Sequence, residues 1–470
     1  MTFISLQFLI FFTLVTLLFF RIRNQQGRIL LLLIASCYFY MSFIPEYILI
    51  LGGVVVVDYF AGLQIEKSEG ASRKMWLYLS ILANIGTLCV FKYYNFFVDN
   101  LHNGLQLFGR QVSLPLLKMA LPLGLSFHTF QALSYTIEVY RGNQKAEKRF
   151  SVYALYVLFY PQLVAGPIER PQNILHQLKE YRPYDWENVK EGLMRMAWGF
   201  FKKAVIADRL AMIVDRTFSH TADSSSLALF AGAFFYYFQV YCDFSGYSDI
   251  ALGAARLMNI RLMDNFNQPF FSKNVSEFWR RWHISLYSWF MDYLFNPIII
   301  SLRNWGKVAV AIGLMTTFLL SGLWHGPAWH HIIYGGLHGS VLTYEYYTRK
   351  QRKKLFGFLP EKLNNILAIG ITFLFLIFSR IFFRAEDVPM AINYLKGLFT
   401  FHGGSNYIGV SRQELVFSVF LIFILILRER YLPTFKITND RYFYPFFIGM
   451  IVLCYLFGVF LENQFIYFQF

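Results

Sequence analysis

Long apolar runs separated by short polar segments recur along almost the whole chain. A helix needs about 20 such residues to cross a bilayer, and runs of roughly that length begin near the N-terminus and continue to the C-terminal end. We place them at 4–21, 28–44, 47–64, 75–97, 115–139, 150–167, 226–257, 306–324, 328–347, 364–384, 413–428 and 441–461. The pattern predicts an all-α polytopic membrane protein with about 11–13 transmembrane helices.

Two further stretches, 187–216 and 268–302, are apolar but interrupted by charged residues. Such segments are typical of re-entrant or interfacial helices, which need protein or a water-filled cavity around their backbone. No internal repeat divides the chain. We therefore expect one integral-membrane domain over 1–470, with a catalytic core at roughly 115–350 and peripheral helices at 1–97 and 364–470.

The composition supports membrane insertion. Hydrophobic residues make up 56% of the chain and charged residues only 15%, against roughly 25% charged residues in soluble domains. The net charge of +15 is concentrated in short loops between apolar runs, so a nucleic-acid partner is disfavoured. The four cysteines include no CxxC pair, which argues against a disulfide framework or a zinc site.

Basic loops predict the orientation, because Lys and Arg concentrate on the cytoplasmic side of a membrane. Counting spans from either end gives a topology with both termini extracytoplasmic. The segments 98–114 and 385–412 then face outward. The loops expected in the cytoplasm include 21–28, 64–74, 349–354 and 428–436.

Three polar clusters interrupt the apolar pattern, and ionisable groups within spans are costly enough to suggest function. In "LPLGLSFHTFQALSYTIEVYRG" (121–142), His128, Gln131 and Tyr135 share one helical face. This face suits either the wall of a tunnel or hydrogen bonding between neighbouring helices. The Pro- and Gly-rich "FYPQLVAGPIERP" (159–171) that follows predicts non-helical backbone.

The second cluster lies in "YCDFSGYSDIALGAARLMNIRLMDNFNQPF" (241–270). Asp243 and Ser245 fall inside an apolar run, together with Asp249. Two carboxylates six positions apart do not form a catalytic pair on a helix, and Arg256 shares a face with Asp249. A structural ion-pair or hydrogen-bond network is the interpretation we favour.

The third cluster, "SEFWRRWHISLYSWFMDYLFNPI" (276–298), interleaves Trp279, Arg280, Arg281, Trp282 and His283. One interpretation is an amphipathic helix lying in the headgroup plane. The other is a wall of an active-site funnel, in which Arg280 or Arg281 binds a phosphate-bearing donor.

Four histidines lie in "SGLWHGPAWHHIIYGGLHG" (321–339). Their spacing matches no metal-binding motif, so we expect no metal. Gly326 and Pro327 interrupt the helix directly after His325, leaving this imidazole on irregular backbone, where it suits a general base for a hydroxyl nucleophile. His338 lies among glycines, which indicate close helix packing and a structural role.

The motifs "FWRRWHISLYSWFMDYLFNPI" and "LSGLWHGPAWHHIIYGGLHG" resemble the membrane-bound O-acyltransferase superfamily. "LPLGLSFHTFQALSY", "FYPQLVAGPIERP", "YCDFSGYSDIALGAARLMNI" and the terminal "FIYFQF" are more similar to its alginate O-acetyltransferase branch, and the resemblance covers essentially the full chain. It implies a ring of tilted helices around a central tunnel. His325 matches the principal catalytic histidine and His283 the second active-site polar residue. Candidates for the donor site or tunnel are Trp279, Trp282, Trp324, Arg280, Arg281, His128, Gln131, Tyr135, Asp243 and Ser245.

The resemblance implies transfer of acetyl from cytoplasmic acetyl-CoA, with no bound cofactor, to an extracellular or cell-wall polysaccharide such as alginate. It also implies a bacterial inner-membrane location and an extracytoplasmic, esterase-like partner protein. The alternatives are D-alanyl transfer to teichoic acid, peptidoglycan O-acetylation and, in a different class, a proton-coupled transporter. Pro327, His330 and His331 depart from the usual family pattern, which affects the expected acceptor geometry but leaves His325 as the base.

Overall fold

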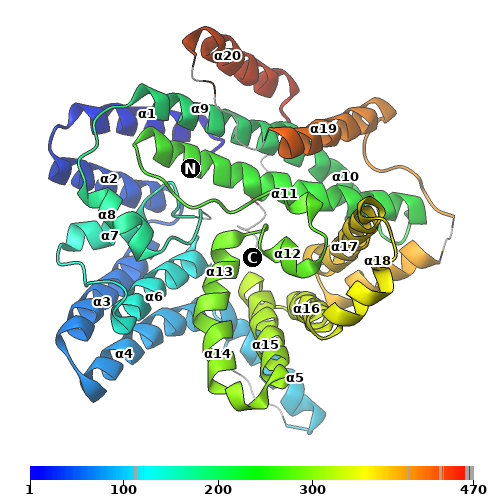
Figure 1. Cartoon of the computed structure of the whole chain (residues 1–470), viewed down its shortest axis with the longest axis horizontal. Helices are drawn as coiled ribbons and strands as arrows, with labels where there is room; N and C mark the ends of the chain where they lie inside the picture. Colours follow the sequence, from blue (N-terminus) through cyan, green and yellow to red (C-terminus); the bar gives the residue numbers. More distant parts are fainter. Residues whose placement is uncertain are drawn as a thin grey trace. The chain divides into compact units, whose positions relative to one another are not determined.

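The chain is mainly helical over the residues that its computed structural model describes, namely 1–110, 114–119, 121–164, 166–400, 403–432, 437, 439–460 and 465 (Figure 1). Two isolated β-bridges, Ser224–Ser405 and Phe266–Trp282, are the extended pairings recorded in these residues. The terminal motif therefore lies outside the described residues except for Phe465, and so do 433–436 of the predicted basic loop 428–436.

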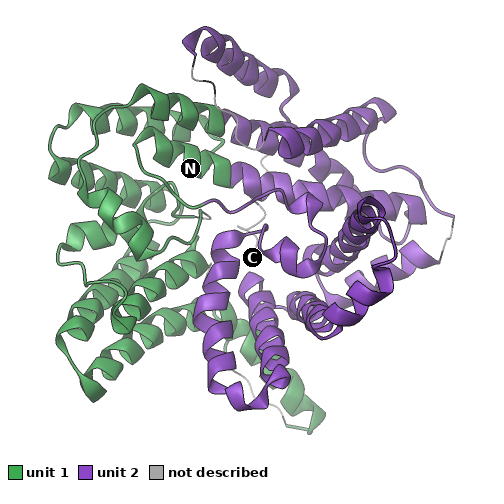
Figure 2. Ribbon diagram, viewed as in Figure 1, with its two compact units in different colours: residues 1–196, 248–263 green, residues 197–247, 264–470 purple. Residues whose placement is uncertain are grey.

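The described chain divides into two compact units (Figure 2). Unit 1 comprises residues 1–196 and 248–263, and unit 2 comprises residues 197–247 and 264–470. The prediction of a single domain with a core at 115–350 stays a prediction.

Unit 1 is built mainly from helices of the N-terminal part of the chain. Polar caps start several of them: the Ser5 hydroxyl accepts from the Phe8 N–H, and the Asn24 side chain accepts from the Gly27 N–H. Its helices are α1 (Leu6–Arg21), α2 (Gln25–Met41), α3 (Tyr47–Lys67), α4 (Gly70–Leu88), η1 (Cys89–Tyr93), α5 (Tyr94–Leu107), α6 (Leu125–Arg141), α7 (Phe150–Leu158), α8 (Pro171–Lys179), most of α9 (Trp186–Phe200) and the end of α11 (Ser226–Leu257).

Unit 2 contains η2, α10, most of α11 and the helices that follow α11 in the chain. They are η2 (Phe201–Ala207), α10 (Asp208–Ser219), η3 (Pro269–Phe271), α12 (Val275–Trp279), α13 (Ile284–Phe290), η4 (Met291–Phe295), α14 (Asn296–Ser301), η5 (Arg303–Trp305), α15 (Lys307–His325), α16 (Trp329–Phe356), α17 (Glu361–Arg384), α18 (Val388–Phe399), α19 (Arg412–Tyr431) and α20 (Asp440–Phe457).

Six helical segments of the described chain are long and apolar enough to cross a membrane. They are α3, the continuous Gly70–Leu107, α11, α15, α17 and α20. Several other runs that we predicted as spans form shorter helices, such as the 9-residue α7 and the 17-residue α2. Apolar side chains including Ile366 and Ile371 of α17 are exposed, as expected for helices that face lipid.

Two predictions about polar segments have opposite outcomes. Non-helical backbone was predicted for 159–171, and residues 159–164 and 166–170 are non-helical: α7 ends at Leu158 and α8 begins at Pro171. The segment 349–354, predicted as a loop, instead belongs to the end of α16. Lys, Arg and Gln are good helix formers, so basic character alone did not mark a helix end there.

Candidate active site

His325 is the last residue of α15, where the helix breaks. Gly326 takes an extended conformation, its N–H donates to the Gly322 carbonyl at 3.3 Å, and α16 begins three residues later at Trp329. The predicted interruption at Gly326–Pro327 is therefore confirmed. The His325 side chain is buried in unit 2.

Glycines allow α15 and α16 to pack closely. A Cβ on Gly322 would lie 2.2 Å from the His331 carbonyl oxygen, and a Cβ on Gly335 would lie 2.1 Å from the Phe318 carbonyl oxygen. The backbones of the two helices are thus in contact, which agrees with the close helix packing predicted from the glycines around His338. This packing sets where the His325 end of α15 lies relative to α16.

His283 stands at a break in the aromatic and basic segment. A continuous amphipathic helix, one of the two interpretations of this segment, is not found: α12 ends at Trp279 and α13 begins at Ile284. His283 has a φ of 46°, in the left-handed region that a non-glycine residue rarely adopts. Asn265 fixes the turn, because its carbonyl accepts from the Ile284 N–H at 3.0 Å and its side-chain oxygen accepts from the Ser285 hydroxyl at 2.6 Å.

One indole ring contacts both candidate catalytic histidines. The ring centroid of Trp324 lies 6.2 Å from that of His283 and 4.9 Å from that of His325. Phe244 packs edge-on against His283 at 4.6 Å, and Phe383 packs edge-on against His325 at 5.2 Å. Burial lowers the pKa of His283 to about 3, so this imidazole is neutral at physiological pH.

His338 lies deeper in the same aromatic cluster. The Trp279 indole N–H donates to His338 Nδ1 at 3.1 Å, and the Tyr334 ring packs 4.5 Å from the imidazole. Tyr334 also lies 6.5 Å from His325 by ring centroids. The structure therefore brings His338 and Trp279, predicted in separate motifs, into direct contact.

The two candidate donor-binding arginines differ in environment. Arg281 forms an ion pair with Glu277 at 2.7 Å, so its charge is largely compensated. Arg280 is exposed and bonds weakly to the Ser276 hydroxyl at 3.4 Å. Trp282 is buried and stacks on Phe278 at 5.4 Å.

Asp243 and Ser245 contact lysines of η2. Lys203 Nζ lies 2.7 Å from Asp243 and 2.8 Å from Asp208, and all three side chains are buried. Lys202 Nζ donates to the Ser245 hydroxyl at 2.9 Å. Asp243 thus belongs to a structural ion-pair network, the interpretation favoured from the sequence, with partners that the motif did not contain.

The acidic and basic residues further along α11 also find partners in unit 1. Asp249 pairs with Arg195 at 2.9 Å, and Arg256 pairs with Glu191 at 2.9 Å. Asp249 and Arg256 share a helical face, but each bonds to α9.

His128, Gln131 and Tyr135 of α6 are buried in unit 1. Gln131 donates from Nε2 to the Tyr156 carbonyl at 2.5 Å, and the Tyr135 hydroxyl accepts from the Glu147 N–H at 2.9 Å. These contacts tie α6 to α7 and to the segment before it. They favour the hydrogen-bonding interpretation of this face, and a tunnel-lining role stays a prediction.

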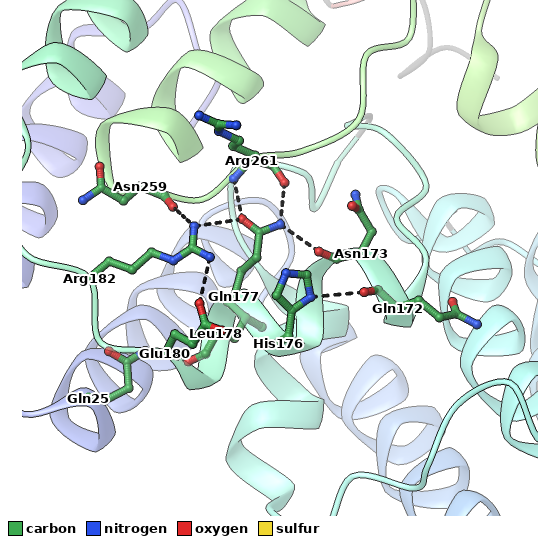
Figure 3. Close-up of polar contacts among 10 residues, drawn as sticks. All are labelled: Gln25, Gln172, Asn173, His176, Gln177, Leu178, Glu180, Arg182, Asn259 and Arg261. Carbon is green, nitrogen blue, oxygen red and sulfur yellow. Dashed lines mark hydrogen bonds and ion pairs between the residues drawn. The ribbon is translucent and has the colours of Figure 1, made fainter.

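A second polar network in unit 1 joins α8 to the segment after α11 (Figure 3). Gln177 donates to the Arg261 carbonyl at 2.9 Å and accepts from the Arg261 N–H at 2.9 Å. Arg182 donates to the Asn259 carbonyl at 2.8 Å and to Glu180 at 3.0 Å. Most of these hydrogen bonds involve backbone groups, so the network fixes the segment after α11 against α8 and the residues that follow α8.

No group of three or more metal-binding side chains occurs in the part of the chain that the structure describes. His330 bonds through Nδ1 to the Phe382 carbonyl at 2.9 Å. His331 packs against Phe383 at 5.3 Å. The cluster of histidines is therefore held by aromatic and backbone contacts.

Several residues around the site were missed from the sequence, notably Asn265, Tyr334, Phe383 and Arg380. Arg380 offered a signal, because it is a charged residue inside the predicted span 364–384. Asn265 and the aromatic residues carried none, since each acts through a contact that only the folded chain creates.

Apolar helices of spanning length and a pair of buried histidines on broken helices define a polytopic membrane protein with a candidate site for proton transfer. The chain belongs to the membrane-bound O-acyltransferase family, whose model matches residues 77–384. It is thus a multi-pass membrane enzyme that transfers acyl groups.

Relatives in this family differ in their acceptors. The chain is 38% identical to the probable alginate O-acetylase AlgI of Pseudomonas aeruginosa over 403 residues, which is 85% of this chain and 75% of that protein. It is 35% identical to the peptidoglycan O-acetyltransferase of Helicobacter pylori, over 82% of this chain and 76% of that protein. Similarity to the teichoic acid D-alanyltransferase of Bacillus subtilis, 31% identical, covers 56% of this chain and 69% of that protein.

Proposed function

We propose that this protein moves acetyl from cytoplasmic acetyl-CoA across the membrane to an acceptor hydroxyl, for O-acetylation of an extracellular or cell-wall polysaccharide such as alginate with the help of an extracytoplasmic partner protein. The single observation that carries the proposal is the contact of both His283 and His325 with the Trp324 ring. Similarity to alginate O-acetylases over 85% of the chain supports acetyl as the group and alginate as the type of acceptor.

His325 acts as the general base in this proposal. Its imidazole takes the proton of the acceptor hydroxyl while the hydroxyl oxygen attacks the thioester carbonyl. The carbon–sulfur bond then breaks, and the thiolate of coenzyme A leaves and takes that proton from the His325 imidazolium, which restores the neutral base. Neutral His283 donates a hydrogen bond that orients the donor or stabilises the oxyanion that forms during attack.

The remaining parts of the proposal concern the location of the enzyme, the binding of its donor, its partner protein and the extent of its catalytic core. The enzyme lies in a bacterial inner membrane with both termini outside the cytoplasm, and exposed Arg280 meets a phosphate of the donor. A separate extracytoplasmic, esterase-like protein completes transfer to the polysaccharide. The catalytic core spans roughly residues 115–350.

Peptidoglycan O-acetylation is the second candidate, favoured by the 35% identity to the Helicobacter pylori enzyme over 82% of the chain. Teichoic acid D-alanylation has weaker support, because that similarity covers 56% of the chain.

Mass spectrometry of polysaccharides from cells with and without the gene separates these functions. Loss of O-acetyl groups from exopolysaccharide supports the first function, and loss from peptidoglycan supports the second. Unchanged acetylation of both polymers, with loss of D-alanine from teichoic acid, contradicts acetyl transfer. A gene copy carrying His325→Ala serves as the control for loss of activity at normal expression.

A further inference from the structure

Arg380 of α17 is a buried cation surrounded by aromatic rings. Its guanidinium carbon lies 4.4 Å from the ring centroid of Tyr237, 4.5 Å from that of Trp282 and 5.2 Å from that of Phe278. The residue is only 2% exposed. Three elements of unit 2 contribute these rings: α11, α12 and the turn that leads to His283.

The terminal nitrogens of the guanidinium have more hydrogens to donate than the described residues accept. Neither terminal nitrogen of Arg380 donates a hydrogen bond of good geometry to a residue that the structure describes. The neutral Tyr237 hydroxyl interacts with the guanidinium, but it supplies no counter-charge. Aromatic faces attract a cation, but they do not replace the five strong donor bonds of an arginine. Burying a charge without hydrogen bonds or a counter-ion is unfavourable.

His338 presents a second donor of the same kind. Because the Trp279 indole is only a donor, the bond at 3.1 Å makes His338 Nδ1 the acceptor. The neutral ring therefore carries its hydrogen on Nε2. That atom is buried and has no hydrogen-bond partner among the described residues.

The segment from Phe278 to Trp282 links the two donors. Trp279 bonds to His338, while its neighbours Phe278 and Trp282 contact Arg380. Phe383, one turn after Arg380 on α17, packs against both His325 and Tyr334. The donors thus lie within the aromatic cluster that surrounds the candidate base.

We propose that Arg380 and His338 form a buried binding site for a small oxyanion, either a carboxylate or a phosphate group. A guanidinium and an imidazole N–H together offer donors and positive charge, and an oxyanion supplies the matching acceptors. The site does not require the acetyl transfer proposed above. Its ligand comes from free acetate or from a phosphate group, and these two sources are separable by experiment.

The test is the thermal stability of the full-length protein in detergent, titrated with sodium acetate or with inorganic phosphate against chloride at constant ionic strength. A ligand that binds the folded state raises Tm in a saturable way. A saturable rise with acetate alone assigns a carboxylate, and one with phosphate alone or with both anions assigns a site that accepts phosphate. Absence of a saturable rise with either anion overturns the proposal.

Variants locate the response. Arg380→Leu should weaken the apparent affinity for the anion by about 10- to 100-fold, since hydrogen bonds to charged groups contribute that much. Arg384→Leu is the matched control, because Arg384 lies one turn away on α17 and pairs with Asp215 at 2.7 Å. The control should keep the wild-type response, and an equal loss in both variants would contradict the site.

Three further variants keep the test informative if Arg380→Leu fails to fold. Arg380→Lys keeps the charge but loses the planar fork, and should retain a weaker saturable response. His338→Gln can still accept from Trp279 and donate to the anion, whereas His338→Phe can do neither. Equal anion responses in these two His338 variants would remove His338 from the site.

The same titration in His325→Ala separates this inference from the proposed function. The anion response should persist there although acetyl transfer is lost. If the wild-type protein shows the saturable rise in Tm with anion but no acetyl transfer, the proposed function is contradicted and the anion site is retained.

Discussion

Unit 1 and unit 2 each bury an arginine against aromatic rings, but the two arginines differ in their hydrogen bonds. Arg28 of unit 1 lies 4.2 Å from the Tyr181 ring, and it also donates to the carbonyls of Ile22 and Arg182 at 2.9 and 2.5 Å. Arg380 of unit 2 also lies over an aromatic ring, that of Tyr237, but its terminal nitrogens donate no hydrogen bond of good geometry to a described residue.

The same contrast extends to other buried polar groups. In unit 1, Gln131, Gln177 and Tyr135 bond to backbone groups of neighbouring segments. In unit 2, His283 and His325 are surrounded by aromatic rings such as Phe244, Trp324 and Phe383. A side chain bonded to backbone contributes to stability, whereas His283 and His325 lie beside Trp324 at the helix breaks where we place the chemistry. We therefore expect changes in unit 2 histidines to alter rate and changes in unit 1 to alter stability.

The largest expected effect is that of His325→Ala. Loss of a general base lowers turnover by about 10²- to 10⁴-fold, so acetyl-CoA consumption by the purified protein should fall by that factor while its Tm stays near the wild-type value. His330→Gln is the matched control: glutamine can still donate to the Phe382 carbonyl that His330 bonds, and turnover should be retained. Full activity of His325→Ala would contradict the assignment.

A somewhat smaller effect is expected for His283→Asn. Asparagine tolerates the left-handed backbone conformation found at this position, so the turn should survive without the imidazole. Loss of one hydrogen bond to a developing oxyanion lowers kcat by about 10²- to 10³-fold. Steady-state kinetics of acetyl-CoA consumption measure this change. A kcat within twofold of wild type, about the resolution of a rate comparison, would exclude His283 from the chemistry.

The break after α15 was predictable, because Gly326 and Pro327 are local signals. His325 stood out through the same signals, whereas His283 was assigned through the resemblance to a known family. The conformation of His283 was not predictable, since it depends on Asn265, eighteen residues earlier in the chain. The rings around Arg380 lie 98 to 143 positions earlier in the chain, and no periodicity encodes such a contact.

Close packing of α15 and α16 provides a test of stability on the unit 2 side. Gly335→Ala would place a methyl group 2.1 Å from the Phe318 carbonyl oxygen, and overpacking of this kind costs about 1–3 kcal/mol. Thermal denaturation should show the loss. Gly336→Ala is the control, because its Cβ would meet only the flexible Leu319 side chain at 3.4 Å. Equal stabilities of the two variants would contradict the close helix contact.

The smallest effect is expected in unit 1. Gln131→Leu removes the bond to the Tyr156 carbonyl, although Gln162 still donates to that oxygen at 2.9 Å. We expect a loss of about 1 kcal/mol in the free energy of unfolding and an unchanged kcat. A large fall in kcat at wild-type stability would instead favour the tunnel-lining role of this face.

The central claim is that His283 and His325, which contact the same Trp324 ring, act on one reacting group. The most direct test is a double-mutant cycle on acetyl-CoA consumption with His283→Asn, His325→Ala and the combined variant. Residues that act as a unit have non-additive effects on rate. We predict that the double variant is about as slow as His325→Ala alone. Rate losses that multiply, as expected for independent sites, would contradict the claim.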